Sequence, residues 1–174
     1  MIQSAIFPRA SPPPAWAEQL LDVFRRHQEE IRSVKAGRRL SSEQVLTLLS
    51  PDLESLGFMI EKVKHDEKAQ AAAAAAGDGR QNVHFDVYQP AWLCCLAIED
   101  GHDWADIGSA MDLVEPLLVS NADTLCLAVP LAQELAEGET HPRASEYERT
   151  SSLAEVVYGH SRVKLPKRLL LIGY

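Results

Sequence analysis

Two neighbouring segments, HFDVYQP at residues 84–90 and LCCLAIEDG at residues 93–101, predict the pair of strands that decides the fold. We expect these strands to carry acidic residues toward a shared end, with Asp86 on the first strand and Glu99 on the second. An Asp and a Glu about a dozen residues apart, on neighbouring strands, form a minimal arrangement for holding a divalent cation with hard oxygen ligands. The functional hypotheses below all depend on this pair.

Length and composition indicate one globular domain. The chain has 174 residues, of which 46% are hydrophobic, and this is enough to bury a sizeable core. Its formal net charge of -8 produces a field that repels a polyanion. If the partner is DNA, it must therefore be held by a local basic patch, a second subunit or a metal ion.

The cysteine pattern and the hydropathy pattern exclude several classes of protein. The three cysteines lie in apolar runs without the paired spacing of a zinc site or a disulfide framework, so we expect reduced core residues. Neither a Gly-x-Ser-x-Gly motif nor a glycine-rich phosphate loop occurs. The sequence shows neither a signal peptide nor an apolar run of roughly 18 residues, and we therefore expect a cytoplasmic protein with no membrane partner.

The first third of the chain predicts an arm followed by helices. Residues 1–15 contain four prolines, which fix φ and remove hydrogen-bond donors, so we expect a Pro-rich arm in place of a folded element. Apolar side chains at helical spacing predict an amphipathic helix over residues 16–33. The pair Ser41 and Gln44 predicts a capped second helix. Residues 50–57 predict a separate short helix with Pro51 in its first turn, and a strand is expected to begin at residue 58.

The remainder of the chain predicts alternating helices and strands. Residues 104–120 predict a crossover helix, and residues 124–130 predict a strand buried on both faces. A helix over residues 145–158 and a buried strand over residues 169–174 follow, with Tyr147, Leu153, Val156 and Val157 expected to face inward from that helix. The expected fold is α/β, a single domain over residues 16–174 with a central mixed sheet flanked by helices.

The order of these elements resembles the common core of the PD-(D/E)XK nuclease superfamily. That order is a helix with Glu54, a strand at Phe58, the strand with Asp86, the strand ending at Glu99, a helix, and a strand at Leu125. The segments FDVYQP (residues 85–90) and LAIEDG (residues 96–101) look like the BamHI- and BglII-like restriction endonucleases, where Glu-x-Glu or Glu-x-Gln replaces Glu-x-Lys. The resemblance covers roughly residues 48–130 and implies a restriction-endonuclease-like fold.

The resemblance also implies roles for individual residues. Asp86 would bind Mg²⁺ or Mn²⁺ together with Glu99, which occupies the third position of the motif, and Glu54 looks like an additional helix acid. Ala97 occupies the place of the first Glu of the doublet and has no oxygen to donate. Two alternatives remain open: the site lost this ligand naturally, or a catalytic glutamate was replaced by alanine to inactivate the protein.

Each of these residues has a simpler interpretation. Asp86 could be a surface acid at a strand end, and Glu99 could begin a solvated acidic turn with Asp100, Asp103 and Asp106. Glu54 could face solvent on a short helix. His84 and His102 flank the expected site and could act as bases or ligands, although surface histidines are commoner.

Two groups of basic residues could contact DNA phosphates. The first consists of Arg162, Lys164, Lys167 and Arg168. The second consists of Arg25, Arg26, Arg32, Lys35, Arg38 and Arg39. The alternative is that both groups are ordinary solvated faces that balance 25 acidic residues.

The sequence thus leads to two functional hypotheses. The first is a metal-dependent DNA endonuclease-like protein whose phosphodiester hydrolysis is impaired by Ala97. Such an enzyme is plausibly a homodimer, since cutting both strands of a duplex favours two-fold symmetry, and the Pro-rich arm and the helix at Trp16 are candidates for the contact. The second is a non-catalytic protein-interaction module that retains the nuclease fold.

Overall fold

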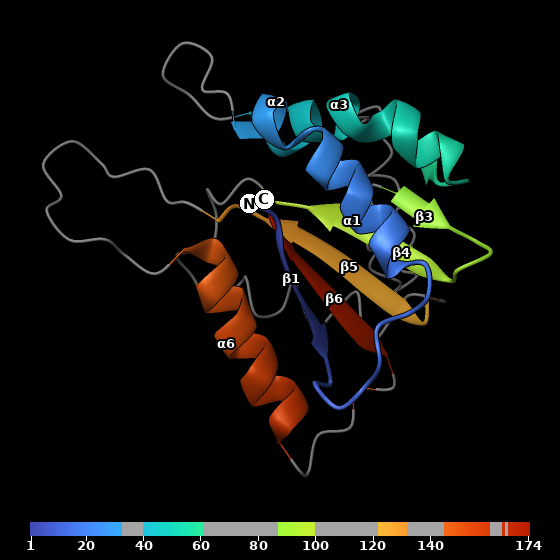
Figure 1. Ribbon diagram of the computed structural model, residues 1–174. Coiled ribbons are helices and arrows are strands. Elements are labelled where there is room, and N and C mark those ends of the chain that lie inside the picture. The colour runs from blue at the N-terminus through green and yellow to red at the C-terminus, as the bar shows by residue number, and fades with distance from the viewer. Residues whose placement is uncertain (33–39, 61–86, 100–121, 132–144, 161–164, 166) are drawn as a thin grey trace, which may run out of the picture.

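A mixed six-stranded sheet forms the centre of the protein (Figure 1). The computed structural model describes residues 1–32, 40–60, 87–99, 122–131, 145–160, 165 and 167–174. The strands, in spatial order, are β1 (Gln3–Phe7), β6 (Arg168–Gly173), β5 (Thr124–Val129), β4 (Cys94–Ile98), β3 (Val87–Gln89) and β2 (Met59–Ile60). Strands β4, β5 and β6 are parallel, and the other neighbouring pairs are antiparallel. The expected α/β fold with a mixed sheet flanked by helices is confirmed.

Helices cover both faces of the sheet and give each face its own core (Figure 1). Helices α1 (Ala17–Arg26), α2 (Gln28–Arg32) and α3 (Ser42–Ser55) lie on one face, and α6 (Glu146–Gly159) lies on the other. Alternate residues of each strand point to opposite faces, so each strand contributes to both cores. In β5, all six residues are buried, as expected of a parallel strand covered on both sides.

The expectation that residues 1–15 form an arm in place of a folded element is wrong for their first part. Gln3–Phe7 form β1, an edge strand that pairs antiparallel with β6 from Gln3–Gly173 to Phe7–Leu169. The prolines follow this strand and so remove none of its donors. Ala5 and Phe7 alternate into the core beside α6, and this burial stabilises the pairing.

The helical boundaries also differ from expectation. The helix expected over residues 16–33 is divided at His27 into α1 and α2, and its continuation from residue 33 lies outside the described residues. The two helices expected over residues 41–57 are one, α3, with Pro51 inside it. Val45, Leu49 and Leu53 are all fully buried on a single stripe, so the packed face continues across the proline, which is itself exposed.

The local capping signals predicted the two ends of α3 correctly, whereas Pro51 did not mark a helix boundary. Ser41 and Gln44 form the predicted capping box at the start of α3. At the other end, Gly57 has a φ of 81°, its N–H donates to Glu54, and the Phe58 N–H donates to Leu53, as in a Schellman motif. The strand expected from residue 58 is present as β2, at the edge of the sheet beyond β3.

Helix α6 lies where the sequence predicted a helix, although its inward face differs in part. Ser145 and Glu148 form a capping box at its start. Glu146, Thr150 and Ala154 are its buried residues, whereas Val156 is 68% exposed. The expected crossover helix over residues 104–120 lies outside the described residues. In the described part of the chain, the helices are too short or too polar to cross a membrane.

Candidate functional site

Strand β4 positions Ala97 and Glu99, the residues at the first and last places of the expected Glu-x-Glu doublet. Its side chains alternate, so Cys94, Leu96 and Ile98 belong to the core under α1 and α3. Cys95 and Ala97 belong to the core on the α6 side. Ala97 is half-buried and pairs with Leu127 of β5. Its methyl group therefore stands beside apolar side chains at the position where the resemblance expects a carboxylate.

Glu99 follows β4 directly, and both of its backbone polar groups are bound. Its N–H donates to the carbonyl of Ala128 at 2.9 Å, which extends the parallel ladder by one residue. Its carbonyl accepts from the Tyr174 phenol at 2.5 Å. Glu99 is half-buried at the carboxyl end of the parallel strands. Ligand sites of open α/β sheets commonly lie at this end.

The described residues include only part of the expected metal site. Asp86, His84 and His102 lie outside the described residues. Among the residues that are described, no group of three or more histidines, cysteines or acids is arranged to hold a metal ion. Mg²⁺ and Mn²⁺ prefer oxygen ligands. The resemblance expects carboxylates at positions 86, 97 and 99, and the described residues supply only Glu99, since Ala97 has no oxygen to donate. By themselves they therefore do not fit a magnesium site.

Glu54 lies at the other end of β4 from Glu99. It is an exposed residue near the end of α3. Two residues further on, the Leu56 carbonyl accepts from Nε2 of Gln89 at 2.8 Å, and Gln89 pairs with Cys94 at the start of β4. Glu99 lies five residue steps along the strand from Cys94, or about 16 Å. The structure therefore does not bring Glu54 together with Glu99.

The described part of the first basic group also lies at that distant end. Lys167 and Arg168 precede and begin β6, where Arg168 pairs with Thr124 at the start of β5. The Arg168 N–H donates to the Asp123 carbonyl at 3.0 Å, and the Lys167 carbonyl accepts from the Tyr158 phenol at 3.0 Å. Partial burial lowers the pKa of Lys167. Arg162 and Lys164 are outside the described residues.

Two arginines of the second basic group, Arg25 and Arg26, pair with acids of the same layer. Arg25 contacts Glu18 at 2.9 Å and Asp22 at 2.6 Å on its own helix. Arg26 contacts Asp52 of α3 at 2.5 Å. These pairs favour the interpretation of a solvated helical face over that of a phosphate-binding surface. Lys35, Arg38 and Arg39 lie outside the described part of the chain.

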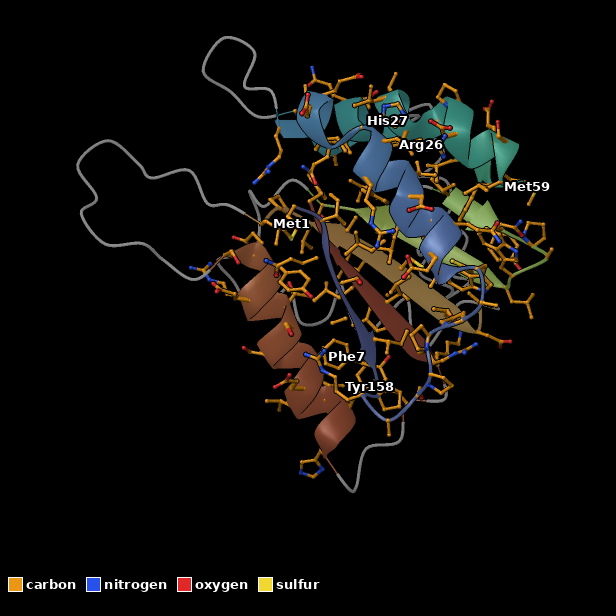
Figure 2. All side chains as sticks on the ribbon, in the orientation of Figure 1. Met1, Phe7, Arg26, His27, Met59 and Tyr158 are labelled. Carbon is orange, nitrogen blue, oxygen red and sulfur yellow. The ribbon has the colours of Figure 1, made fainter. Side chains whose placement is uncertain are left out.

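The Asp52 carboxylate joins α3 to the end of α1. It accepts from Arg26 and lies 2.7 Å from Nε2 of His27, whose side chain is 20% exposed (Figure 2). The hydrogen bond from His27 lowers the pKa of Asp52, and the charge of Arg26 adds to the effect. The group is a fixed contact between helices, on the outer side of the α1–α3 layer.

Two residues at the carboxyl end of the sheet had no role predicted from the sequence. Tyr174 was assigned only to a buried strand, yet its phenol binds Glu99. Glu146 is 3% exposed in the first turn of α6, 3.7 Å from Arg149, and the neighbouring Tyr147 N–H donates to Pro130 at the end of β5. The capping signal at Ser145 could have located the start of α6, but a contact between residues 99 and 174 has no local signal.

The expected core cysteines are confirmed. Cys94, Cys95 and Cys126 are free and buried, and the sulfurs of Cys94 and Cys126 lie 3.3 Å apart on adjacent strands. Burial raises the pKa of the Cys126 thiol well above its usual value, and contact with Cys94 raises it further. A protonated, buried thiol is a poor nucleophile and a poor metal ligand.

A scan against protein-family models and searches of curated proteins and of solved structures gave no match. The function is therefore inferred from the motif and from the geometry around β4.

Proposed function

We propose that this chain is a metal-dependent DNA endonuclease-like protein whose phosphodiester hydrolysis is impaired because alanine stands at position 97. The observation that supports the proposal is the arrangement of β4. This strand lies between an antiparallel neighbour and a parallel neighbour, and it leads Ala97 and Glu99 toward its carboxyl end. The order α3, β2, β3, β4 and β5 agrees with the order on which the nuclease resemblance depends.

The pairing of β3 with β4 supports the proposal, because the resemblance expects these two strands to be neighbours. The described pairs are Val87 with Leu96, Tyr88 with Cys95 and Gln89 with Cys94. In the proposal, the resemblance assigns Asp86, which directly precedes Val87 in the sequence, as a further ligand. A glutamate at position 97 would provide the carboxylate that the motif lacks, two residues before Glu99. Mg²⁺ or Mn²⁺ bound there would supply the charge stabilisation that phosphodiester hydrolysis needs.

The placement of the basic residues limits how DNA would be bound. Lys167 and Arg168 lie at the amino end of β6, about 16 Å along the strands from Glu99. Duplex DNA rises about 3.4 Å per base pair, so these side chains would meet phosphates roughly five base pairs from the cleaved bond. They would strengthen binding without acting in the reaction. The repulsion from the net charge of -8 makes such remote contacts useful.

Plasmid nicking by matched variants tests the proposal. We expect supercoiled DNA with Mg²⁺ or Mn²⁺ to be nicked at least about 10–100-fold faster by Ala97→Glu than by the unaltered chain, since changes at the outer ligands of a metal already cost this much. Ala97→Gln has the same size without the charge and should give no increase. Adding Glu99→Gln to Ala97→Glu should abolish the gain.

The opposite result would favour the second hypothesis. If folded Ala97→Glu protein does not nick DNA with either metal, the nuclease proposal is overturned. The chain would then be a non-catalytic interaction module that retains the fold. Circular dichroism of each variant would establish that it is folded.

A further inference from the structure

We infer that Thr124 and Arg168 form a binding site for a phosphate group at the amino end of the parallel strands. The amino ends of β5 and β6 lie side by side at the lower right of Figure 1, and the two residues are direct partners in the ladder. Paired residues of adjacent parallel strands point to the same face of a sheet. Here that face lies under α1 and α3, because Cys126 and Leu170, two residues further along each strand, belong to the core on that side.

Thr124 carries a hydroxyl that no described part of the chain satisfies. The residue is fully buried, and its Oγ1 has no hydrogen-bond partner among the described residues. Its neighbour on β4 is Cys94, whose thiol contacts the Cys126 sulfur and the Cys95 carbonyl. A buried hydroxyl without a partner reduces the stability of a protein. Its presence here therefore indicates a partner that comes from outside the chain.

Thr150 shows the ordinary case in the same protein. It is also fully buried, but its Oγ1 donates to the Glu146 carbonyl, one turn earlier in α6, at 2.8 Å. A helix places a carbonyl within reach of a threonine hydroxyl in this way, whereas a strand does not. The two threonines thus differ in the partner of the hydroxyl and not in the degree of burial.

Arg168 gives the site a positive charge and a route to solvent. Its side chain is half-buried, and within the described ranges it forms no ion pair with an acid. Four other arginines each contact an acidic side chain: Arg9, Arg25, Arg26 and Arg149. The charge of Arg168 is therefore left for a ligand.

The donors of the two side chains match a phosphate group. A guanidinium donates two parallel N–H groups to two oxygens of a phosphate, and a hydroxyl can donate to a third oxygen. A carboxylate has two oxygens, so it cannot give each of these three donors an oxygen of its own. The pair Thr124 and Arg168 is therefore expected to prefer phosphate to a carboxylate.

Thermal unfolding with inorganic phosphate tests the site, with acetate at the same ionic strength as the reference anion. An anion that binds the folded chain raises its melting temperature as the anion concentration increases. We expect phosphate to raise the melting temperature more than acetate does in the unaltered chain and in Thr150→Val. Thr124→Val and Arg168→Gln should lose this difference. Calorimetric titration should show phosphate binding at least about tenfold weaker in these two variants, since each lacks a hydrogen bond to a charged group.

Without phosphate, the two threonine variants should shift the melting temperature in opposite directions. Thr124→Val removes a hydroxyl that has no partner, so it should raise the melting temperature by about 2–4 °C. Thr150→Val removes a hydroxyl that is hydrogen-bonded and should lower the melting temperature by a similar amount. A lower melting temperature in Thr124→Val would show that its hydroxyl has a partner within the chain, and this result would overturn the inference.

The binding results decide the inference separately from the proposed function. Equal shifts with phosphate and acetate overturn it, and so does a phosphate shift that persists in Thr124→Val or in Arg168→Gln. Neither result affects metal-dependent nicking, because the site lies about 16 Å along the strands from Glu99.

A duplex oligonucleotide distinguishes the two sources of the phosphate group. For DNA as the source, the inference rests on the proposed function. Competition between the duplex and inorganic phosphate in the unaltered chain, lost in Thr124→Val, supports a contact with the DNA backbone. Binding of inorganic phosphate without binding of the duplex supports a site for a free phosphate group and contradicts the DNA contact of the proposed function.

Discussion

The two ends of the parallel strands β4, β5 and β6 are built in different ways. At the carboxyl end, the acidic residue Glu99 is held by hydrogen bonds to Ala128 and Tyr174. At the amino end, the Leu93 carbonyl accepts from Asp123 and Thr124, and the cations Lys167 and Arg168 lie nearby. One end therefore holds the backbone of an acidic residue in place, whereas the other carries two partly buried basic residues.

The aromatic packing follows the same division. At the carboxyl end, Phe24 is fully buried and packs against Tyr174. At the amino end, Trp16 is half-buried and stacks on Trp92, with centroids 5.1 Å apart and planes inclined at 4°. The sequence suggested the Pro-rich arm and the helix at Trp16 for a dimer contact. Within the chain, Gln3–Phe7 of that arm pair with β6, and Trp16 stacks on Trp92.

The largest effect is expected from removing the aromatic support of the carboxyl end. Phe24→Ala should reduce the free energy of unfolding by about 3–5 kcal/mol, because it leaves a cavity in the core. Trp16→Ala should cost less, since part of the Trp16 ring is already in contact with water. Urea denaturation of the two variants measures the difference. A loss in Trp16→Ala that equals or exceeds that in Phe24→Ala would contradict the comparison.

An intermediate effect is expected at Gly173, beside Tyr174. A Cβ on Gly173 would lie 2.5 Å from Cδ2 of Leu131 and 2.7 Å from Cδ2 of Tyr147. Gly173→Ala should therefore destabilise the protein by about 1–3 kcal/mol through overpacking, less if the Leu131 side chain moves aside.

Gly159 offers the control for this substitution, because no atom lies within 4 Å of the corresponding Cβ position. Gly159→Ala, at the end of α6, should be neutral or stabilising by up to about 1 kcal/mol. Thermal unfolding of both variants compares a crowded and an open position. Equal melting temperatures would show that the carboxyl end is less tightly packed than described.

The smallest effect is expected above the sheet, at the contact between α1 and α3. The pKa of Asp52 is below its usual value of 3.8 in the folded chain, so its ion pairs contribute stability above that pH. This stability is lost as the pH falls through the lowered pKa. Asp52→Asn should therefore lose a little stability at pH 7 and show a smaller fall in melting temperature at acid pH than the unaltered chain.

Glu54→Gln is the matched control, since Glu54 is an exposed acid on the same helix. We expect its unfolding free energy at pH 7 to stay within about 0.5 kcal/mol of the unaltered chain. If the melting temperature of Asp52→Asn falls at acid pH as much as that of the unaltered chain, Asp52 adds nothing to the stability of the contact.

Patterns that are local in the sequence predicted much of the fold. The apolar runs of β5 and β6 and the capping boxes at Ser41 and Ser145 have immediate physical causes in burial and in hydrogen bonding of helix ends. The prediction of a separate helix at Pro51 was wrong. A proline within a helix costs one hydrogen bond, and burial of the apolar stripe of α3 outweighs that cost. The prediction that Val156 faces inward was wrong, because apolar character alone does not indicate which face of a helix is buried.

The candidate site was predicted less completely than the fold. The position of Glu99 at the end of a strand followed from the run of apolar residues before it. The sequence did not predict that Glu54, Lys167 and Arg168 lie far from Glu99. This separation depends on the direction in which α3 and β6 cross the sheet. The Tyr174 contact joins residues far apart in the chain, and such a contact becomes visible only when the strands are assembled.

The pairing of β1 with β6 has a consequence for the order of assembly. These strands are neighbours in space although they lie near opposite extremes of the sequence. Until β6 has been synthesised, β1 has no partner and the outer edge of β5 is open, and open strand edges are templates for association with other chains. Such non-local pairing also slows folding. Until β6 pairs with β1 and β5, the newly made chain should therefore depend on dilution or on chaperones to avoid association with other chains.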